Sequence, residues 1–301
     1  MLSVEGFTHD SALSLAVLAG TGAVSLVGLA FNVLLLKSLW RVHESWGTFS
    51  FYIIACVAVS DISASLAILG TGVFRALLGF PGLLESAWYC RAFGFTLFLS
   101  YSMSGTLLSI LSLNRYLLVV HQARLWPPYA WFALGVVSLV SAALLGYTMY
   151  NDAFMLDPTF SYCVPAVRGR FEVTSQIIIF LTNIPVIFVC FCYSAIFLVC
   201  WRIEHHHQGS PVRHLPLRAL LVMLTYLICY TPDFLSIMWL LTMGAHPPFI
   251  FYILVPFSLS CILAINPILV VFLSKRVRHE VLLMFAPLTS SPKVYENAAS
   301  N

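Results

Sequence analysis

Ionisable side chains interrupt three long apolar stretches of this 301-residue sequence, namely Asp61, Arg115 and Asp233. A charged group in an apolar environment is costly, so such a residue usually has a function. Two carboxyls that face one cavity could act as the acid–base pair of an aspartyl intramembrane protease or as relay groups in ion transport. Their flanking sequences, VSDIS and TPDFL, carry no signature of such a protease.

Other catalytic patterns find no support in the sequence. It contains no Gly-rich phosphate loop, no Ser-His-Asp arrangement and no HExxH motif. The adjacent histidines His205, His206 and His207 lack the convergent geometry of a metal site. The small net charge of +3, without a basic stripe interleaved with aromatics, gives no sign of nucleic-acid binding. We therefore predict a protein that is not an enzyme, has no catalytic residues and carries no organic cofactor.

The amino-acid composition indicates that lipid, not water, surrounds these residues. Hydrophobic residues make up 60% of the chain and charged residues only 9%, against about a quarter charged in soluble domains. The apolar residues fall into seven segments long enough to cross a bilayer as helices. They are Ala12–Leu36, Phe49–Thr71, Ala92–Leu118, Tyr129–Tyr150, Val173–Trp201, Leu215–Met243 and Pro248–Leu273. We predict an all-α, seven-transmembrane helix bundle followed by a short amphipathic helix at Ser274–Phe285 on the membrane surface.

Loop charges predict the orientation of the bundle. With the N-terminus outside, most lysines and arginines fall on the inner side, as the positive-inside rule requires. This predicts an extracellular N-terminus at residues 1–11, a transmembrane domain at 12–273 and a cytoplasmic helix and tail at 274–301, in the plasma membrane. Cys90 and Cys163 are then the two cysteines outside the cell, where an oxidising compartment favours a disulfide between them over two free thiols.

Polar residues and prolines occur in an ordered set along the spans. Asn32 lies in GLAFNV and Asp61 in ACVAVSD. Arg115 follows Cys90 by 25 residues, roughly 37 Å along a helix, so the two mark opposite ends of one span. Pro185 and Tyr193 lie eight residues apart, and CYTP and NP sequences follow in the sixth and seventh spans.

This ordered set resembles the rhodopsin-like (class A) G-protein-coupled receptors over nearly the whole chain. The resemblance implies that Asp61, Ser104 and Asn266, with Asn32, form a polar cluster that often holds a sodium ion in that family. It implies that Arg115, flanked by Asn114 and Tyr116, meets a heterotrimeric G protein when the bundle opens. Tyr193 resembles the tyrosine that swings toward this arginine, and Pro232 and Pro267 match helix kinks.

Three departures from the family pattern bear on switching. Asn114 replaces the acidic residue before the arginine, Tyr230 the tryptophan of CWxP, and Val270 the tyrosine of NPxxY. Because Asn114 lacks a charge, we expect a weaker hold on Arg115 and raised basal signalling.

Residues in the extracellular halves of the spans predict the kind of ligand. Ser260 stands where retinal-binding opsins have a lysine, so retinal is disfavoured, and Leu97 stands where amine receptors have an aspartate. An apolar and aromatic wall favours a small or lipid-like ligand. Asp233 is either its polar anchor or a structural residue kept neutral by burial. The predicted ligand-binding residues are Leu97, Phe98, Tyr101, Ile178, Leu181, Tyr230, Asp233, Phe234, Tyr252 and Ser260.

Two other functions remain open. A transporter would use Asp61 and Asp233 as relay groups, although transport does not require the Cys90–Arg115 spacing and no inverted repeat is visible. A receptor-shaped protein that has lost G-protein coupling would account for Asn114 and Val270.

Overall fold

The computed structural model describes residues 12–42, 49–85, 87–156, 162–165, 172–206, 214–243 and 247–285. These residues form eight helices and two short strands. The helices are α1 (Ala12–Val42), α2 (Phe49–Glu85), α3 (Ala87–Val120), α4 (Pro127–Tyr150), α5 (Glu172–His206), α6 (His214–Met243), α7 (Phe249–Leu273) and α8 (Lys275–Phe285). The strands are β1 (Phe154–Leu156) and β2 (Cys163–Pro165). Seven helices, α1 to α7, are long and apolar enough to cross a membrane, which confirms the predicted fold class.

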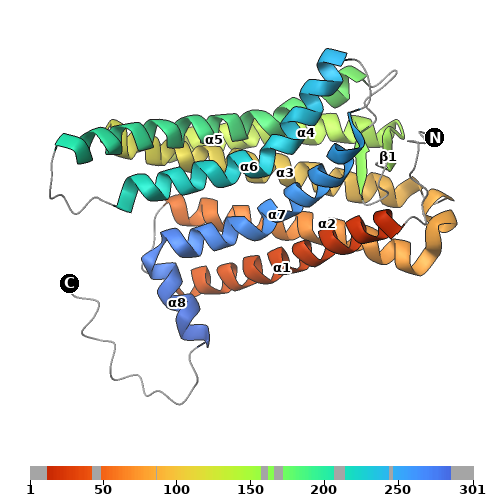
Figure 1. The fold of residues 1–301 in the computed structure, drawn as a ribbon, viewed down its shortest axis with the longest axis horizontal. Coiled ribbons are helices and arrows are strands. Elements are labelled where there is room, and N and C mark those ends of the chain that lie inside the picture. Colours follow the sequence, from red (N-terminus) through yellow and green to blue (C-terminus); the bar gives the residue numbers. More distant parts are fainter. Residues whose placement is uncertain are drawn as a thin grey trace.

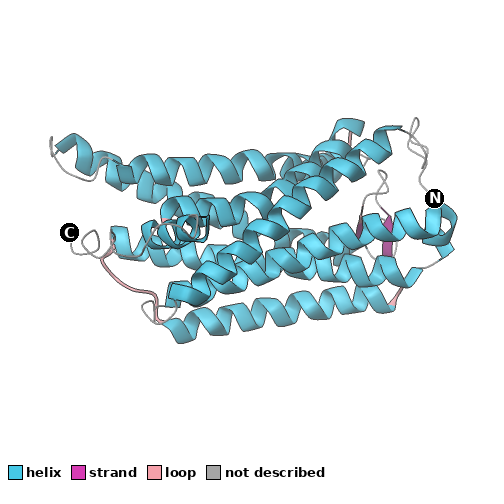
Figure 2. Cartoon of the chain, turned by 90° about the horizontal axis from the view of Figure 1, so that it is seen from below, coloured by secondary structure: helices cyan, strands magenta, loops and turns pink. Residues whose placement is uncertain are grey.

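The seven long helices run side by side along the long axis of the molecule (Figures 1 and 2). At one end α8 lies across the bundle, and at the other end lies the β1–β2 hairpin (Figure 1). We call the hairpin side the disulfide end, after Cys90–Cys163, and the opposite side the arginine end, after Arg115. Helix α3 packs against α2, α4 and α5, and it therefore forms the centre of the bundle.

Most helices extend beyond the apolar segments predicted for them. Helix α1 continues past Lys37 to Val42, and α2 continues past Arg75 to Glu85. These two apolar segments end near a charged residue, but a helix satisfies its own backbone hydrogen bonds and continues into more polar surroundings. Arg75 is buried, with its Nη1 donating to Ser14 Oγ of α1 at 3.2 Å. Helix α4 begins at Pro127, at the proline pair that predicted its first turn.

The hairpin at the disulfide end was not predicted, because strands of three residues give no readable alternation. The strands are antiparallel, with Leu156 opposite Cys163. Cys163 is bonded to Cys90 of α3, which confirms the predicted disulfide. Phe154 of β1 lies directly against α3 at Gly94, where an added Cβ would stand only 2.6 Å from the phenylalanine ring. The absence of a side chain at Gly94 therefore lets the hairpin lie close on α3.

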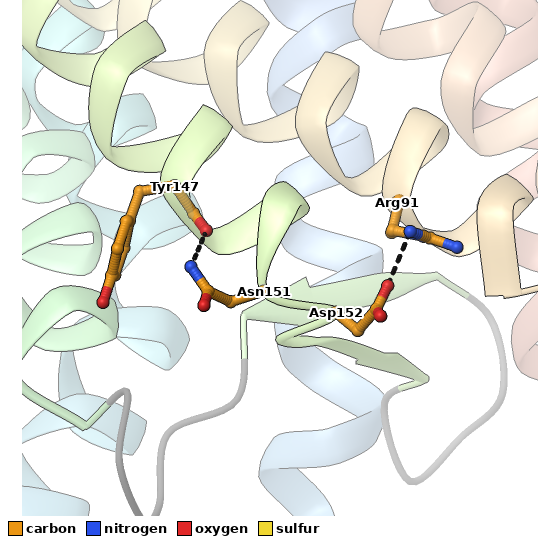
Figure 3. A network of polar contacts seen from close by, with 4 residues as sticks. All are labelled: Arg91, Tyr147, Asn151 and Asp152. Atoms are coloured by element: carbon orange, nitrogen blue, oxygen red, sulfur yellow. Dashed lines mark hydrogen bonds and ion pairs between the residues drawn. The ribbon is translucent and has the colours of Figure 1, made fainter.

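An ion pair also holds the segment between α4 and the hairpin (Figure 3). Arg91 of α3 approaches Asp152 to 2.6 Å, and Asn151 donates to the carbonyl of Tyr147 at 2.8 Å. Asp152 has a left-handed backbone with φ of 54°, which turns the chain back toward α3. Because the Arg91–Asp152 pair is largely exposed, it contributes less than the disulfide beside it.

Helices α1 and α7 approach each other unusually closely at Gly28. A Cβ at this position would lie 3.0 Å from the backbone carbon of Leu263 and 3.1 Å from the nitrogen of Ala264. One turn further on, Asn32 Nδ2 donates to the carbonyls of both Gly28 and Leu263 at 2.9 Å. Gly28 thus lets α1 and α7 approach closely, and the amide of Asn32 joins them by a hydrogen bond.

This close contact between α1 and α7 predicts that a larger side chain at Gly28 lowers the stability of the protein. We expect Gly28→Ala to destabilise the protein by about 1–3 kcal/mol, because the added methyl meets backbone atoms that cannot rotate away. The apparent melting temperature of the purified protein in lipid discs measures the effect. Gly22→Ala is the matched control, since nothing lies within 4 Å of its added Cβ, and we expect a change between zero and about 1 kcal/mol of stabilisation. Equal melting temperatures for the two variants would contradict the packing argument.

Candidate functional site: a polar chain and the arginine end

Asp61 is the centre of a buried polar cluster that joins three helices. The carboxyl is 1% exposed and accepts hydrogen bonds on both oxygens. Ser104 of α3 donates to Oδ1 at 2.7 Å, and Asn266 Nδ2 of α7 donates to Oδ2 at 2.8 Å. The structure therefore brings together the three residues that sequence reasoning grouped as a possible sodium site.

The cluster continues onto α6 through a residue that sequence reasoning missed. The hydroxyl of Tyr226 donates to Asn266 Oδ1 at 2.8 Å, and both side chains are buried. Tyr226 precedes Tyr230 by one helical turn, so the two lie on one face of α6. That spacing was the available signal, because a face carrying Tyr230 toward the bundle also carries Tyr226 toward it.

Arg115 and Asn114 turn toward different partners. Arg115 Nη1 donates to the hydroxyl of Tyr193 on α5 at 2.8 Å. Asn114 Nδ2 reaches Ser50 of α2 at 3.4 Å, and its Oδ1 accepts from the backbone N–H of Leu125 at 3.2 Å. Consecutive residues of a helix point about 100° apart, which separates the two side chains. Asn114 thus ties the segment after α3 to the bundle.

Tyr116, grouped with Arg115 in sequence reasoning, packs against the apolar cluster that contains Tyr193, while its hydroxyl has a different neighbour. Its hydroxyl is 3.2 Å from His121 Nε2, and its ring packs edge-on against that histidine. A role of Tyr116 in G-protein coupling stays a prediction.

We call the hydrogen-bonded series of Ser104, Asp61, Asn266 and Tyr226 the polar chain. A cavity of about 40 Å³ lies between this polar chain and Arg115. Its walls come from α1, α2, α3, α5, α6 and α7. Among the lining residues are Asn32, Arg115, Tyr193, Tyr226, Asn266, Pro267 and Val270. Asn32 Oδ1 is buried without a hydrogen-bond partner among the described residues. A space of this size with several polar groups on its walls is large enough to hold water.

The predicted ligand wall divides into two clusters at the disulfide end. Leu97 and Tyr101 pack with residues of α2 and α7, including Ala64 and Leu263. Phe98 and Ile178 instead pack around the hairpin and α4, with Phe154, Cys163 and Leu145. The division follows from helix geometry, because Phe98 is one residue from Leu97 and so faces about 100° away from it. Tyr101 is buried and its hydroxyl has no partner among the described residues.

The remaining wall residues differ in exposure. Asp233 is half-buried beside Tyr230, and the side chain of Asn183 on α5 interacts with its carboxyl. Phe234 is 43% exposed, while Leu181 and Tyr252 are half-buried. Ser260 is buried and donates to the carbonyl of Pro256 in its own helix at 2.8 Å. Asp61 and Asp233 thus have different partners, an arrangement unlike a pair of carboxyls that share one proton.

The donor atoms of the Asp61 cluster allow a test of the sodium prediction. Asp61 and Ser104 supply oxygen atoms of the kind that a hard cation prefers. Asn266 turns its nitrogen toward Asp61 and its oxygen toward Tyr226, so it supplies no oxygen in this arrangement. A sodium ion would be held by Asp61 and Ser104. No group of three or more His, Cys, Asp or Glu side chains that could hold a metal occurs in the described part of the chain.

The seven helices, which are long and apolar enough to cross a membrane, define the class of multi-pass membrane proteins. The family described as 7 transmembrane receptor (rhodopsin family) matches residues 31–270. The chain belongs to this family, whose members are in general not enzymes. No curated protein matches the sequence.

The cluster predicts sodium-dependent stability. We expect a higher apparent melting temperature in sodium chloride than in choline chloride, because an ion bound to the folded state stabilises it by about 1.4 kcal/mol at ten times its dissociation constant. Asp61→Asn removes the charge and should abolish the difference. Asp233→Asn, the matched control at the other carboxyl, should keep it. Equal melting of the unaltered protein in both salts would rule the ion out.

Proposed function

We propose that this protein is a G-protein-coupled receptor of the plasma membrane with an extracellular N-terminus. A small, largely apolar ligand binds at the disulfide end. The arginine end of α6 then moves outward, and Arg115 meets a heterotrimeric G protein in the opened space. The ligand acts by binding one of two bundle conformations more tightly than the other.

The observation that carries this proposal is the arrangement around Arg115. The guanidinium lies beside a cavity, half-buried, and its hydrogen bond goes to Tyr193 of a neighbouring helix. An arginine that served only to end a span would extend toward water. Here it lies between α3 and α5, in reach of any group that enters when α6 moves away.

Features of the disulfide end support the ligand part of the proposal. The buried wall around Leu97 and Tyr101 is apolar and aromatic, with Tyr162 of the segment before β2 packed against it. Polar groups are few, as in pockets for drug-sized apolar ligands. Asp233 and the hydroxyl of Tyr101 are the anchors that we assign to a donor and an acceptor on the ligand.

Nucleotide exchange on a panel of Gα subunits, with receptor in lipid discs and with candidate ligands, tests the function. We expect Arg115→Ala to lower exchange about tenfold or more, since a charged hydrogen-bond partner contributes about 1.5–3 kcal/mol. Arg91→Ala is the matched control, because Arg91 pairs with Asp152 at the opposite end and should leave exchange intact.

The same purified protein, reconstituted into sealed vesicles as well as lipid discs, separates the alternatives. Solute flux across vesicles in the absence of ligand, without exchange on any Gα, would support a transporter instead. Normal surface expression with neither exchange nor flux would support a receptor-shaped protein that no longer couples.

Asn114 provides a second test. We expect Asn114→Asp to lower basal exchange about twofold to fivefold, because a carboxylate on the residue next to Arg115 attracts its guanidinium without direct contact, and a part-exposed charge attraction contributes up to about 1 kcal/mol to the closed state. An aspartate can still accept from Leu125 N–H and from Ser50, so the local fold is kept. Asn114→Ala adds no charge and should not lower basal exchange. A fall of the same size in both variants would mean that charge is not the cause.

A further inference from the structure

Tyr226 makes the hydrogen bond that joins α6 to the polar cluster. Its hydroxyl lies 2.8 Å from Asn266 Oδ1, and the amide nitrogen of the same asparagine lies 2.8 Å from Asp61 Oδ2. With Ser104 on the other oxygen of Asp61, the chain of hydrogen bonds crosses α3, α2, α7 and α6. Tyr226 is its end on α6.

The position of Tyr226 relative to Pro232 gives this bond a mechanical consequence. Pro232 lies within α6, where it removes a backbone donor and lets the helix bend. Tyr226 lies six residues before it, roughly 9 Å toward the arginine end at the helical rise per residue. Tyr226 therefore belongs to the half of α6 that swings outward, and the swing must lengthen or break its bond to Asn266.

The space next to this bond explains why a tyrosine on α6 fits here. Val270 lies on α7 where NPxxY sequences have a tyrosine, and it lines the same cavity as Tyr226, Tyr193 and Arg115. A valine leaves space that a phenol at that position would occupy. When the bond to Asn266 breaks, the hydroxyl of Tyr226 has a polar neighbourhood to enter, formed by Tyr193 and Arg115.

The ring of Tyr226 also lies beside that of Tyr230, one of the predicted ligand-binding residues. Its centroid is 6.4 Å from that of Tyr230, with the rings inclined at 33°. Tyr230 in turn lies three residues before Asp233, in the part of α6 predicted to contact ligand. A ligand that shifts Tyr230 therefore displaces the residue that carries the hydrogen bond.

We propose that Tyr226 is a latch that holds the arginine end of α6 against α7 through its hydrogen bond to Asn266. The proposal rests on the proposed movement of α6 but concerns its control. Release of the Tyr226–Asn266 bond favours the outward position. Ligand contact at Tyr230 favours that release.

The test measures the position of α6 without a G protein. A trifluoromethyl-phenylalanine at Leu217, which is 62% exposed at the arginine end of α6, reports inward and outward populations by fluorine NMR in lipid discs. We expect Tyr226→Phe to raise the ratio of outward to inward populations about twofold to tenfold, since one hydrogen bond contributes about 0.5–1.5 kcal/mol net. Tyr129→Phe removes a hydroxyl from a residue of α4 that is 65% exposed and should change nothing.

A double-mutant cycle with Asn266→Leu shows whether the hydroxyl acts through Asn266. Asn266→Leu alone should raise the outward population, which tests the latch even if Tyr226→Phe does not reach the membrane. Adding Tyr226→Phe to Asn266→Leu should produce no further rise. A rise as large as in the unaltered protein, or unchanged populations in both single variants, would overturn the latch.

Nucleotide exchange on the same variants separates this inference from the proposed function. Shifted populations without exchange on any Gα would remove the function and leave the latch. Exchange by the unaltered protein, with basal exchange and populations unmoved by Tyr226→Phe, would remove the latch and leave the function.

Discussion

The buried carboxyl of Asp61 is the constraint on which the arrangement of this bundle depends. A carboxyl that is removed from water must receive hydrogen bonds, because leaving it without donors costs several kcal/mol. Its donors come from α3 and α7, and the asparagine that serves it from α7 is itself bonded to α6. Close contact between α1 and α7 through Asn32 adds a fifth helix. One buried acidic group thus fixes the relative positions of most of the spans.

The two ends of the bundle are held together in different ways. At the disulfide end, a covalent bond, an ion pair and the contact of Phe154 with Gly94 attach the hairpin to α3. At the arginine end, no covalent bond is found among the described residues; apolar clusters and single hydrogen bonds, such as Arg115 with Tyr193, join the helices around a cavity. Packed interiors resist deformation whereas cavities and single hydrogen bonds yield to it. This difference supports the proposed movement of α6 at the arginine end.

Much of this structure follows from the sequence, because lipid allows few solutions. Long apolar segments predicted the seven helices, and loop position predicted the Cys90–Cys163 bond. Resemblance to the receptor family grouped Asp61, Ser104 and Asn266, which the structure brings into hydrogen-bond contact. The helices and the disulfide are confirmed because each depends on a strong local pattern or an ordered set of residues, whereas a sodium ion in the Asp61 cluster stays a prediction.

What escaped sequence reasoning depends on contacts between distant segments. The three-residue strands form because β1 and β2 meet under the constraint of the disulfide, and no pattern of their own predicts them. Tyr226 is one of many aromatic residues in apolar segments; its spacing from Tyr230 indicates the face of α6 on which it lies, but not its bond to Asn266. Asn114 was considered for its lost charge beside Arg115, whereas its side chain turns to Ser50 and Leu125. The ligand wall was treated as one surface, although Leu97 and Phe98 face different clusters. Side-chain direction around a helix axis decides the last three of these cases.

The central claim is that the polar chain holds α6 in one of two positions that a G protein can distinguish. The most direct measurement is the distribution of distances between spin labels at Leu217 of α6 and Trp40 of α1, both exposed at the arginine end, with the labels carried on non-natural amino acids in lipid discs. The account predicts two populations and a gain of the longer distance when a nucleotide-free G protein is added. A single distribution that the G protein leaves unchanged would contradict it.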